Sequence, residues 1–209
     1  MHTRRKLRRF LAAFFAILLA VGWHEQGVCE SPILYVMVGQ TPVGVRNPAG
    51  FVDPRIVNPQ FGALFKDVST PSHQSLVVLI PHQDVRRMMA GAKPDLDRVL
   101  RIDVHRDSAV STTSLADFKL LKGSLHAMLT SKNPANEVIF DETERSISRI
   151  EVRPRVVIST SIVHVREKVI RVGVESTLED GKNEDWVKSM TREFIGLILD
   201  ANKPSTSRP

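Results

Sequence analysis

The sequence has little of what would commit a protein to one chemistry. Its 209 residues include a single cysteine, so no intramolecular disulfide can form and stability has to come from a packed core. It has no Gly-x-Ser-x-Gly nucleophile elbow, and no Lys-Ser/Thr follows Gly39 and Gly44 as in a phosphate-binding loop. We therefore expect no cofactor. A Ser-His-Asp triad stays open, because its members need not be close in sequence.

A concentrated basic surface is also missing, although the formal net charge is +6. Five of the 29 basic residues and none of the 23 acidic residues lie within residues 1–22, which leaves nearly equal numbers in the rest of the chain. The remaining basic cluster, Arg149, Arg153 and Arg155, is typical of a solvated strand edge. Because nucleic-acid binding needs a basic face to neutralise phosphates, we expect no nucleic-acid partner.

The N-terminus has the pattern of a secretory signal peptide. Basic residues between Arg4 and Arg9 precede an apolar run from Phe10 to Gly22. As a helix this run would reach about 20 Å, short of the roughly 30 Å hydrocarbon core of a bilayer. We expect residues 1–22 to be removed, with cleavage as late as Cys29 as an alternative, and the mature chain to be periplasmic or secreted without a transmembrane span.

Three other fates of this segment stay open. Arg4-Arg5 and Arg8-Arg9 are twin arginines of the kind used for export of folded proteins, but the full hydrophobic pattern does not follow them. Cys29 could carry a lipid, although Gln26-Gly27-Val28 differs from the sequence that a lipoprotein peptidase recognises. An uncleaved N-terminus would keep the protein at the inner membrane. Ordinary export with cleavage is the simplest of these.

The rest of the chain predicts one domain, residues 30–202, followed by a disordered tail, 203–209. Within the domain, prolines and glycines recur through residues 39–74, so we expect a long surface excursion with little regular structure. Such loops are often functional, and this one is a candidate to line a site. The side chains expected to pin it to the body are Phe51, Phe61, Leu64 and Phe65.

Strand patterns dominate the domain. Residues 155–165 and 168–176 are rich in Val and Ile and flank a tight polar turn, which predicts an antiparallel hairpin. Further strands are expected over residues 33–38, 76–80 and 99–106, with a weaker hairpin over 138–150. Together with the helices below, this order favours an α+β fold, a largely antiparallel sheet with helices packed on it.

Three helices are predicted. Residues 82–91 form a short one with Val85, Met88 and Met89 on its inner side. Ser114 is a good N-cap, with Asp117 in a capping-box position, for a helix to about residue 131, which Asn133-Pro134 ends. This helix is expected to bury one stripe, formed by Leu115, Phe118, Leu121 or Lys122, Leu125 and Leu129. Asn183 caps the last helix, whose buried stripe is expected to contain Trp186, Met190, Phe194, Leu197 and Ala201.

The histidines are the only obvious material for a catalytic or metal site. Asp103 and His105 are two residues apart on a predicted strand and so share a face. With His164 on a neighbouring strand, they could form a transition-metal site. The simpler interpretation is a polar sheet face that happens to carry histidine.

The C-terminal third resembles a known fold. Its order is the strand Val156–Val165, the turn Arg166-Glu-Lys, the strand Val169–Glu175, an acidic loop and a helix from Asp185-Trp-Val to Ala201-Asn. This resembles the closing unit of the PsbP-like fold and also uncharacterised exported proteobacterial proteins. The resemblance implies an antiparallel sheet between helices, an α/β/α sandwich, and a non-enzymatic accessory or binding role, with no catalytic residue to carry over.

Export, a near-neutral mature charge and the missing motifs together predict a non-catalytic periplasmic accessory or binding protein. Its partner would be another envelope protein or a small ligand, and its oligomeric state stays open. The alternative is a small exported hydrolase or metal-dependent enzyme that uses Asp103, His105 and His164.

Overall fold

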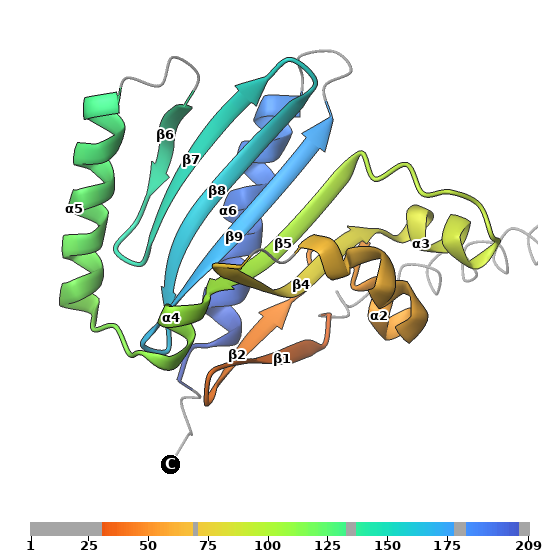
Figure 1. Cartoon of the computed structure of the whole chain (residues 1–209), viewed down its shortest axis with the longest axis horizontal. Helices are drawn as coiled ribbons and strands as arrows, with labels where there is room; N and C mark the ends of the chain where they lie inside the picture. The colour runs from red at the N-terminus through yellow and green to blue at the C-terminus, as the bar shows by residue number, and fades with distance from the viewer. Residues whose placement is uncertain (1–30, 69–70, 133–136, 178–182, 205–209) are drawn as a thin grey trace, which may run out of the picture. The chain divides into compact units, whose positions relative to one another are not determined.

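Antiparallel strand pairing organises the chain, of which the computed structural model describes residues 31–68, 71–132, 137–177 and 183–204. Seven strands form one sheet in the order β3-β4-β5-β9-β8-β7-β6, each antiparallel to its neighbours (Figure 1). They are β3 (Phe51–Val52), β4 (His73–Pro81), β5 (Arg98–His105), β6 (Glu137–Glu142), β7 (Ser146–Arg153), β8 (Val156–Val165) and β9 (Lys168–Thr177). A separate two-stranded sheet contains β1 (Ile33–Val38) and β2 (Thr41–Arg46).

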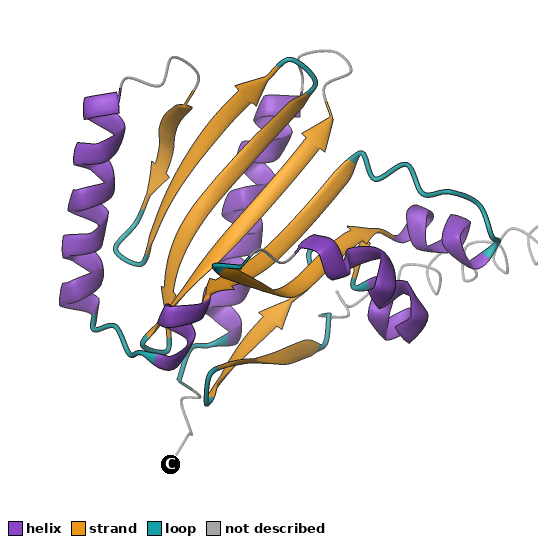
Figure 2. Cartoon of the chain, in the orientation of Figure 1, coloured by secondary structure: helices purple, strands orange, loops and turns teal. Residues whose placement is uncertain are grey.

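Helices complete an α+β fold, as predicted. Behind the sheet in Figure 2 runs the C-terminal helix α6 (Asn183–Ala201), while α5 (Leu115–Lys132) stands beside β6. The shorter helices are α2 (Pro54–Val57), the 3-10 helix η1 (Pro59–Val68), α3 (His82–Met89) and α4 (Arg106–Val110). The predicted signal segment with both cleavage positions and Cys29, the Asn133-Pro134 helix stop and the tail from residue 205 lie outside the described residues.

The main core lies between α6 and one face of the sheet. Strand alternation places Leu100 and Ile102 of β5 and Val172 of β9 on this face, each 0% exposed. Phe194 and Ile198 of α6 are also 0% exposed and belong to the same cluster. Burial of large aliphatic and aromatic side chains against each other is what fixes α6 to the sheet.

The β8–β9 hairpin is confirmed and has the tightest possible connection. Val165 pairs with Lys168, so the turn consists of Arg166 and Glu167 alone. Their φ angles are 49° and 60°, the left-handed values that a two-residue hairpin turn of type I′ requires. Residues other than glycine adopt these angles at some cost, which the ten-residue strands on either side offset.

The end of α6 is tied to the separate β1–β2 sheet through Asn202. Its side-chain Nδ2 donates to the Gly44 carbonyl at 2.7 Å, and its Oδ1 accepts from the Gly44 N–H at 2.9 Å. A Cβ on Gly44 would lie 3.0 Å from the Ala201 carbonyl oxygen and 3.0 Å from the Ile33 side chain. A glycine is therefore needed here for the close approach of β2 to the helix.

The proline-rich segment 39–74 is more regular than predicted. It contains β2, β3, α2 and η1, because its prolines sit where helices and edge strands tolerate them. Pro54 occupies the first turn of α2, after an N-cap Asp53 whose carboxylate accepts from the Arg55 N–H at 2.9 Å. As predicted, Phe51, Phe61 and Phe65 pack against the body.

The predicted helices form, with differences in what they bury. Ser114 and Asp117 make the predicted capping box, in which Ser114 Oγ accepts from the Asp117 N–H at 3.1 Å. In α3, Val85 and Met88 are buried, but Met89 is 59% exposed, so its predicted inward position is wrong. The buried face of α6 consists of Val187, Met190, Thr191, Phe194, Ile195 and Ile198. Of the predicted stripe, Trp186, Leu197 and Ala201 are only partly buried.

Candidate functional site

The structure does not bring the three predicted metal ligands together. Asp103 and His105 share one face of β5, as predicted, and the register also places His164 of β8 on that face. However, β9 lies between β5 and β8, so the expectation of a neighbouring strand is wrong. Within the described ranges, no group of three or more His, Cys, Asp or Glu side chains could hold a metal ion.

The His164 side chain is buried and packs between β8 and the start of α5. It is 3% exposed, and its ring stacks on Phe118 of α5 with 5.4 Å between centroids. Its Nε2 lies 2.7 Å from the Thr113 carbonyl oxygen, so Nε2 carries the proton and donates. The side chain thus connects β8 to the start of α5.

His105 instead meets His73, its partner across β4 and β5. The two rings make an edge-to-face contact with 5.1 Å between centroids. Asp103, 3% exposed, accepts from the Arg171 guanidinium at 2.9 Å on the same face. Burial lowers the pKa of His73, the Arg171 charge and His105 lower it further, and Asp103 opposes them.

A cleft is found at the opposite end of β5 from this cluster. It has a volume of about 620 Å³ and lies where β3, the start of α3, the chain before β5, the end of β9 and the start of α6 meet. We call it the Trp186 cleft. Segment 39–74 contributes residues 49–51, so the segment suspected of lining a site does line this cleft. The lining residues used below are Phe51, Asp84, Arg86, Asp97, Arg98 and Trp186.

An aromatic and cationic stack forms one wall of the Trp186 cleft. The rings of Phe51 and Trp186 are stacked, with centroids 6.3 Å apart and planes inclined by 30°. The guanidinium carbon of Arg98 lies 4.4 Å from the Trp186 ring centroid, within the range of a cation–π contact. Trp186 is half-buried, so it serves the core and the cleft at once, whereas the sequence predicted only a core role.

A second, larger hollow of about 1180 Å³ lies at the opposite end of α6. It is formed around the β8–β9 turn and the residues that follow the helix, with Tyr35 and Arg145 at its sides. Small-molecule sites usually measure about 300–1,000 Å³ and combine aromatic surface with a few placed polar groups. The Trp186 cleft falls within that size range and has an aromatic wall, although most of its lining residues are polar or charged, and the larger hollow exceeds the range.

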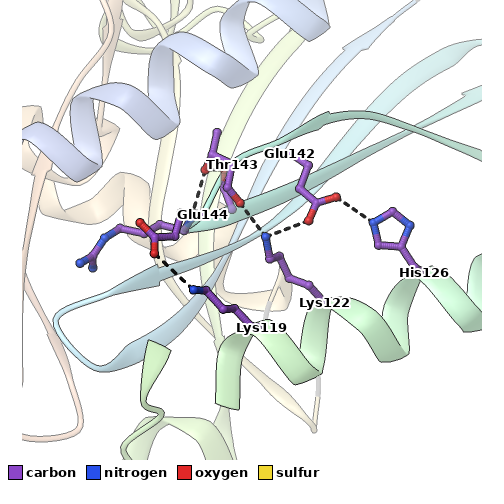
Figure 3. A network of polar contacts seen from close by, with 8 residues as sticks. Lys119, Lys122, His126, Glu142, Thr143 and Glu144 are labelled. Atoms are coloured by element: carbon purple, nitrogen blue, oxygen red, sulfur yellow. Dashed lines mark hydrogen bonds and ion pairs between the residues drawn. The ribbon is translucent and has the colours of Figure 1, made fainter. Parts of the chain in front are cut away.

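A third polar assembly joins α5 to the sheet (Figure 3). Lys122 is 8% exposed, and its Nζ donates to Glu142 at 2.8 Å and to the Thr143 carbonyl at 2.6 Å. His126 Nε2 lies 2.8 Å from the other Glu142 oxygen. Hydrogen bonds from Lys122, then from His126, lower the pKa of Glu142. These contacts join α5 to β6 and to the turn that follows it.

Two of the residues that shape the cleft had a sequence signal that was not used. Arg98 directly precedes the predicted strand 99–106, and Trp186 lies in the first turn of a predicted helix, so both positions are at element ends. Sites often form where element ends gather. The sequence does not predict their contact, because the contact depends on the pairing of β9 with β5. This pairing places the start of α6, which follows β9 in the chain, near the start of β5.

No family model matches the sequence, and no curated protein matches it. Two solved structures are similar over 82% of this chain and 94% of theirs: the Ran-binding protein Mog1p of Saccharomyces cerevisiae, with 8% identity and a TM-score of 0.41, and PsbP of the cyanobacterium Synechocystis sp. PCC 6803, with 13% identity and a TM-score of 0.35. A PsbP protein is thus among the similar structures, as the C-terminal third predicted. These likenesses concern the fold and carry nothing about ligand or partner.

A helix that spans a membrane has to be both long and apolar. Among the helices of the described residues, none is both long enough and apolar enough to cross a bilayer.

Proposed function

We propose that this chain is a non-catalytic binding protein that acts outside the cytoplasm and holds a small ligand in the Trp186 cleft. The observation that carries the proposal is the stack of Phe51, Trp186 and Arg98 along the wall of a hollow of about 620 Å³. An indole and a guanidinium together provide an apolar platform and fixed hydrogen-bond donors, which is what a small-molecule site needs.

The cleft is built on rigid supports. Trp186 is anchored by α6, whose next turns are buried in the main core. Phe51 is 8% exposed and begins β3, which pairs with the end of β4. A site whose walls are held by packed elements needs little ordering when a ligand arrives, and this favours binding.

The place of action is supported by the N-terminal sequence. A basic start followed by a short apolar run is typical of a secretory signal. The nearly equal numbers of acidic and basic residues beyond residue 22 suit a protein that does not depend on nucleic acid.

Native mass spectrometry of the protein recovered from its own host tests this function. We expect a bound small molecule on the wild-type chain and none on Ala49→Trp, because Ala49 is an exposed residue that lines the cleft and an indole there would fill it. Ala127→Trp places the same side chain on the exposed side of α5 and should keep the molecule.

Two results would contradict the proposal. One is a molecule that stays bound to Ala49→Trp as well as to the wild type. The other is a bare wild-type mass together with no rise in the thermal unfolding temperature when an extract of the host's small molecules is added, since a ligand that binds only the folded state must raise it.

A further inference from the structure

The carboxylates of the Trp186 cleft are all engaged by the protein. Asp84 is 1% exposed and accepts from the Asp95 N–H at 3.1 Å. Asp95 forms an ion pair with Arg87. Asp97 accepts from the Thr177 hydroxyl at 3.0 Å. Each of these carboxylates therefore already has a hydrogen-bond or ion-pair partner in the protein, although the neutral donors of Asp84 and Asp97 leave their charges in place.

The two arginines of the cleft are not committed in this way. Arg86 and Arg98 are both exposed and both line the cleft, and within the part of the chain that the structure describes neither forms an ion pair with a carboxylate. Arg98 contacts the Trp186 ring instead. Among the charged side chains of the cleft, these two exposed arginines are the groups left to meet a ligand, because Asp84 is buried and Asp97 already accepts from Thr177.

The stacked position of Arg98 suits it for recognising an anion. A guanidinium over an aromatic face keeps its in-plane N–H groups available, and these groups match the two oxygens of a carboxylate or phosphate. The contact with Trp186 also restricts the long side chain in advance, so less conformational entropy is lost when a ligand binds.

The start of α3 adds potential of the same sign. Its N-cap is Pro81, which makes no side-chain capping hydrogen bond, and His82 and Gln83 of its first turn line the cleft. A helix start carries partial positive charge, which the hydrogen bond from the His82 N–H to the Gly50 carbonyl and the Asp84 carboxylate of the first turn reduce here. This contribution is secondary to that of the two arginines.

We propose that the ligand of the Trp186 cleft is a small organic anion whose carboxylate or phosphate group binds Arg98 and Arg86 while its apolar part packs beside Trp186. This inference rests on the proposed binding function and names the chemistry of its ligand.

Four probes of nearly equal size separate charge from shape: benzoate, phenyl phosphate, neutral benzamide and cationic benzylamine. The full chain carrying Trp23→Phe leaves Trp186 as the only tryptophan, so one indole N–H signal in the NMR spectrum reports on the cleft. We expect benzoate or phenyl phosphate to shift that signal saturably and to bind at least about ten-fold more tightly than the other two probes. The stronger of the two anions tells a carboxylate ligand from a phosphate ligand.

Substitution of the arginines completes the test. Arg98→Gln and Arg86→Gln should each lower the affinity for the anion by about ten-fold or more. Arg106 is an exposed arginine outside the cleft, so Arg106→Gln should leave that affinity unchanged. All three residues are exposed, so the variants are expected to fold, and circular dichroism checks this.

Equal or tighter binding of benzamide or benzylamine, or unchanged anion binding by Arg98→Gln, would overturn the anion assignment and leave the binding function standing. A lack of response to all four probes up to about 10 mM would also overturn it. The binding function would then be decided by the Ala49→Trp comparison, which does not depend on the ligand's charge.

Discussion

The two long helices are attached to the sheet by different kinds of contact, apolar burial for α6 and mainly polar contacts for α5. Helix α6 has 19 residues, of which six are buried. Five of the six are apolar or aromatic, and the sixth is Thr191. Helix α5 has 18 residues, but among those whose side chains are described only Phe118 and Lys122 are buried. Two helices of similar length thus play different parts: α6 builds the core, whereas α5 borders it although it has five leucines against two in α6.

The attachment of α5 is largely polar. Lys122 and His126 reach Glu142, and Lys122 also reaches the Thr143 carbonyl (Figure 3). Phe118 supplies the aromatic contact with His164. Polar contacts exchange water for protein partners and stabilise less than apolar burial of the same extent. The comparison teaches that α5 should open at lower free energy than α6, as locally unfolding units do.

The largest expected effect tests this difference with two phenylalanines that are both 0% exposed. Phe194→Ala on α6 should lower the free energy of unfolding by about 3–5 kcal/mol, because it leaves a cavity in the main core. Phe118→Ala on α5 should lower it by about 1–2 kcal/mol, since the loss cannot exceed the free energy that attaches α5. Urea unfolding measures both, and equal losses would contradict the distinction.

A smaller effect is expected from a change in pH, which should weaken the attachment of α5 through the protonation of Glu142. Its pKa is lowered in the folded protein by the hydrogen bonds from Lys122 and His126, so this carboxylate stabilises the attachment of α5 above the usual pKa range of glutamic acid. The stabilisation is lost as the pH falls through the lowered pKa. The ratio of the exchange rates of the α5 and α6 amides should therefore rise as the pH falls below about 4.5, the usual pKa of glutamic acid.

Glu142→Gln is the control for the pH effect. It keeps the shape of the side chain and removes the titrating group, so α5 should exchange faster at neutral pH and respond less to acid. An unchanged pH response in this variant would mean that other carboxylates control α5. Glu144, which forms an ion pair with Lys119 of α5 at 3.5 Å, would be the first to examine.

The local parts of this fold could be predicted, because their signals are local. The β8–β9 hairpin follows from two Val- and Ile-rich runs joined by a polar turn, and the structure confirms it. The capping box of Ser114 and Asp117 is confirmed for the same reason, since both partners lie within one helical turn. Such features need no knowledge of the rest of the fold.

Features set by distant pairing could not be predicted. The strand order places β9 between β5 and β8, which separates His164 from His105 and brings His73 to His105 instead. The Trp186 cleft depends on the same order, because Arg98 and Trp186 lie far apart in the chain and meet only through the β5–β9 pair. Residue types alone contain no information on which strands become neighbours.

Periodicity also overstated the burial of α5. Leu115, Leu125 and Leu129 recur at helical spacing and predicted a buried stripe, yet these side chains are only half-buried. The exposed part of the helix also carries leucines, with Leu120 73% exposed and Leu121 37% exposed. A leucine-rich helix indicates burial only when a second layer covers it, and the sheet reaches one side of α5.

The smallest expected effect concerns that outer side. Leu120→Ser should change the free energy of unfolding by no more than about 0.5 kcal/mol, because an exposed side chain loses little contact when it is shortened. Leu125→Ser, on the half-buried side, is the matched control and should cost about 1–2 kcal/mol. If Leu120→Ser cost as much as Leu125→Ser in urea unfolding, Leu120 would have to be covered in solution. The border role of α5 would then be wrong, since its two sides would contribute alike to the folded state.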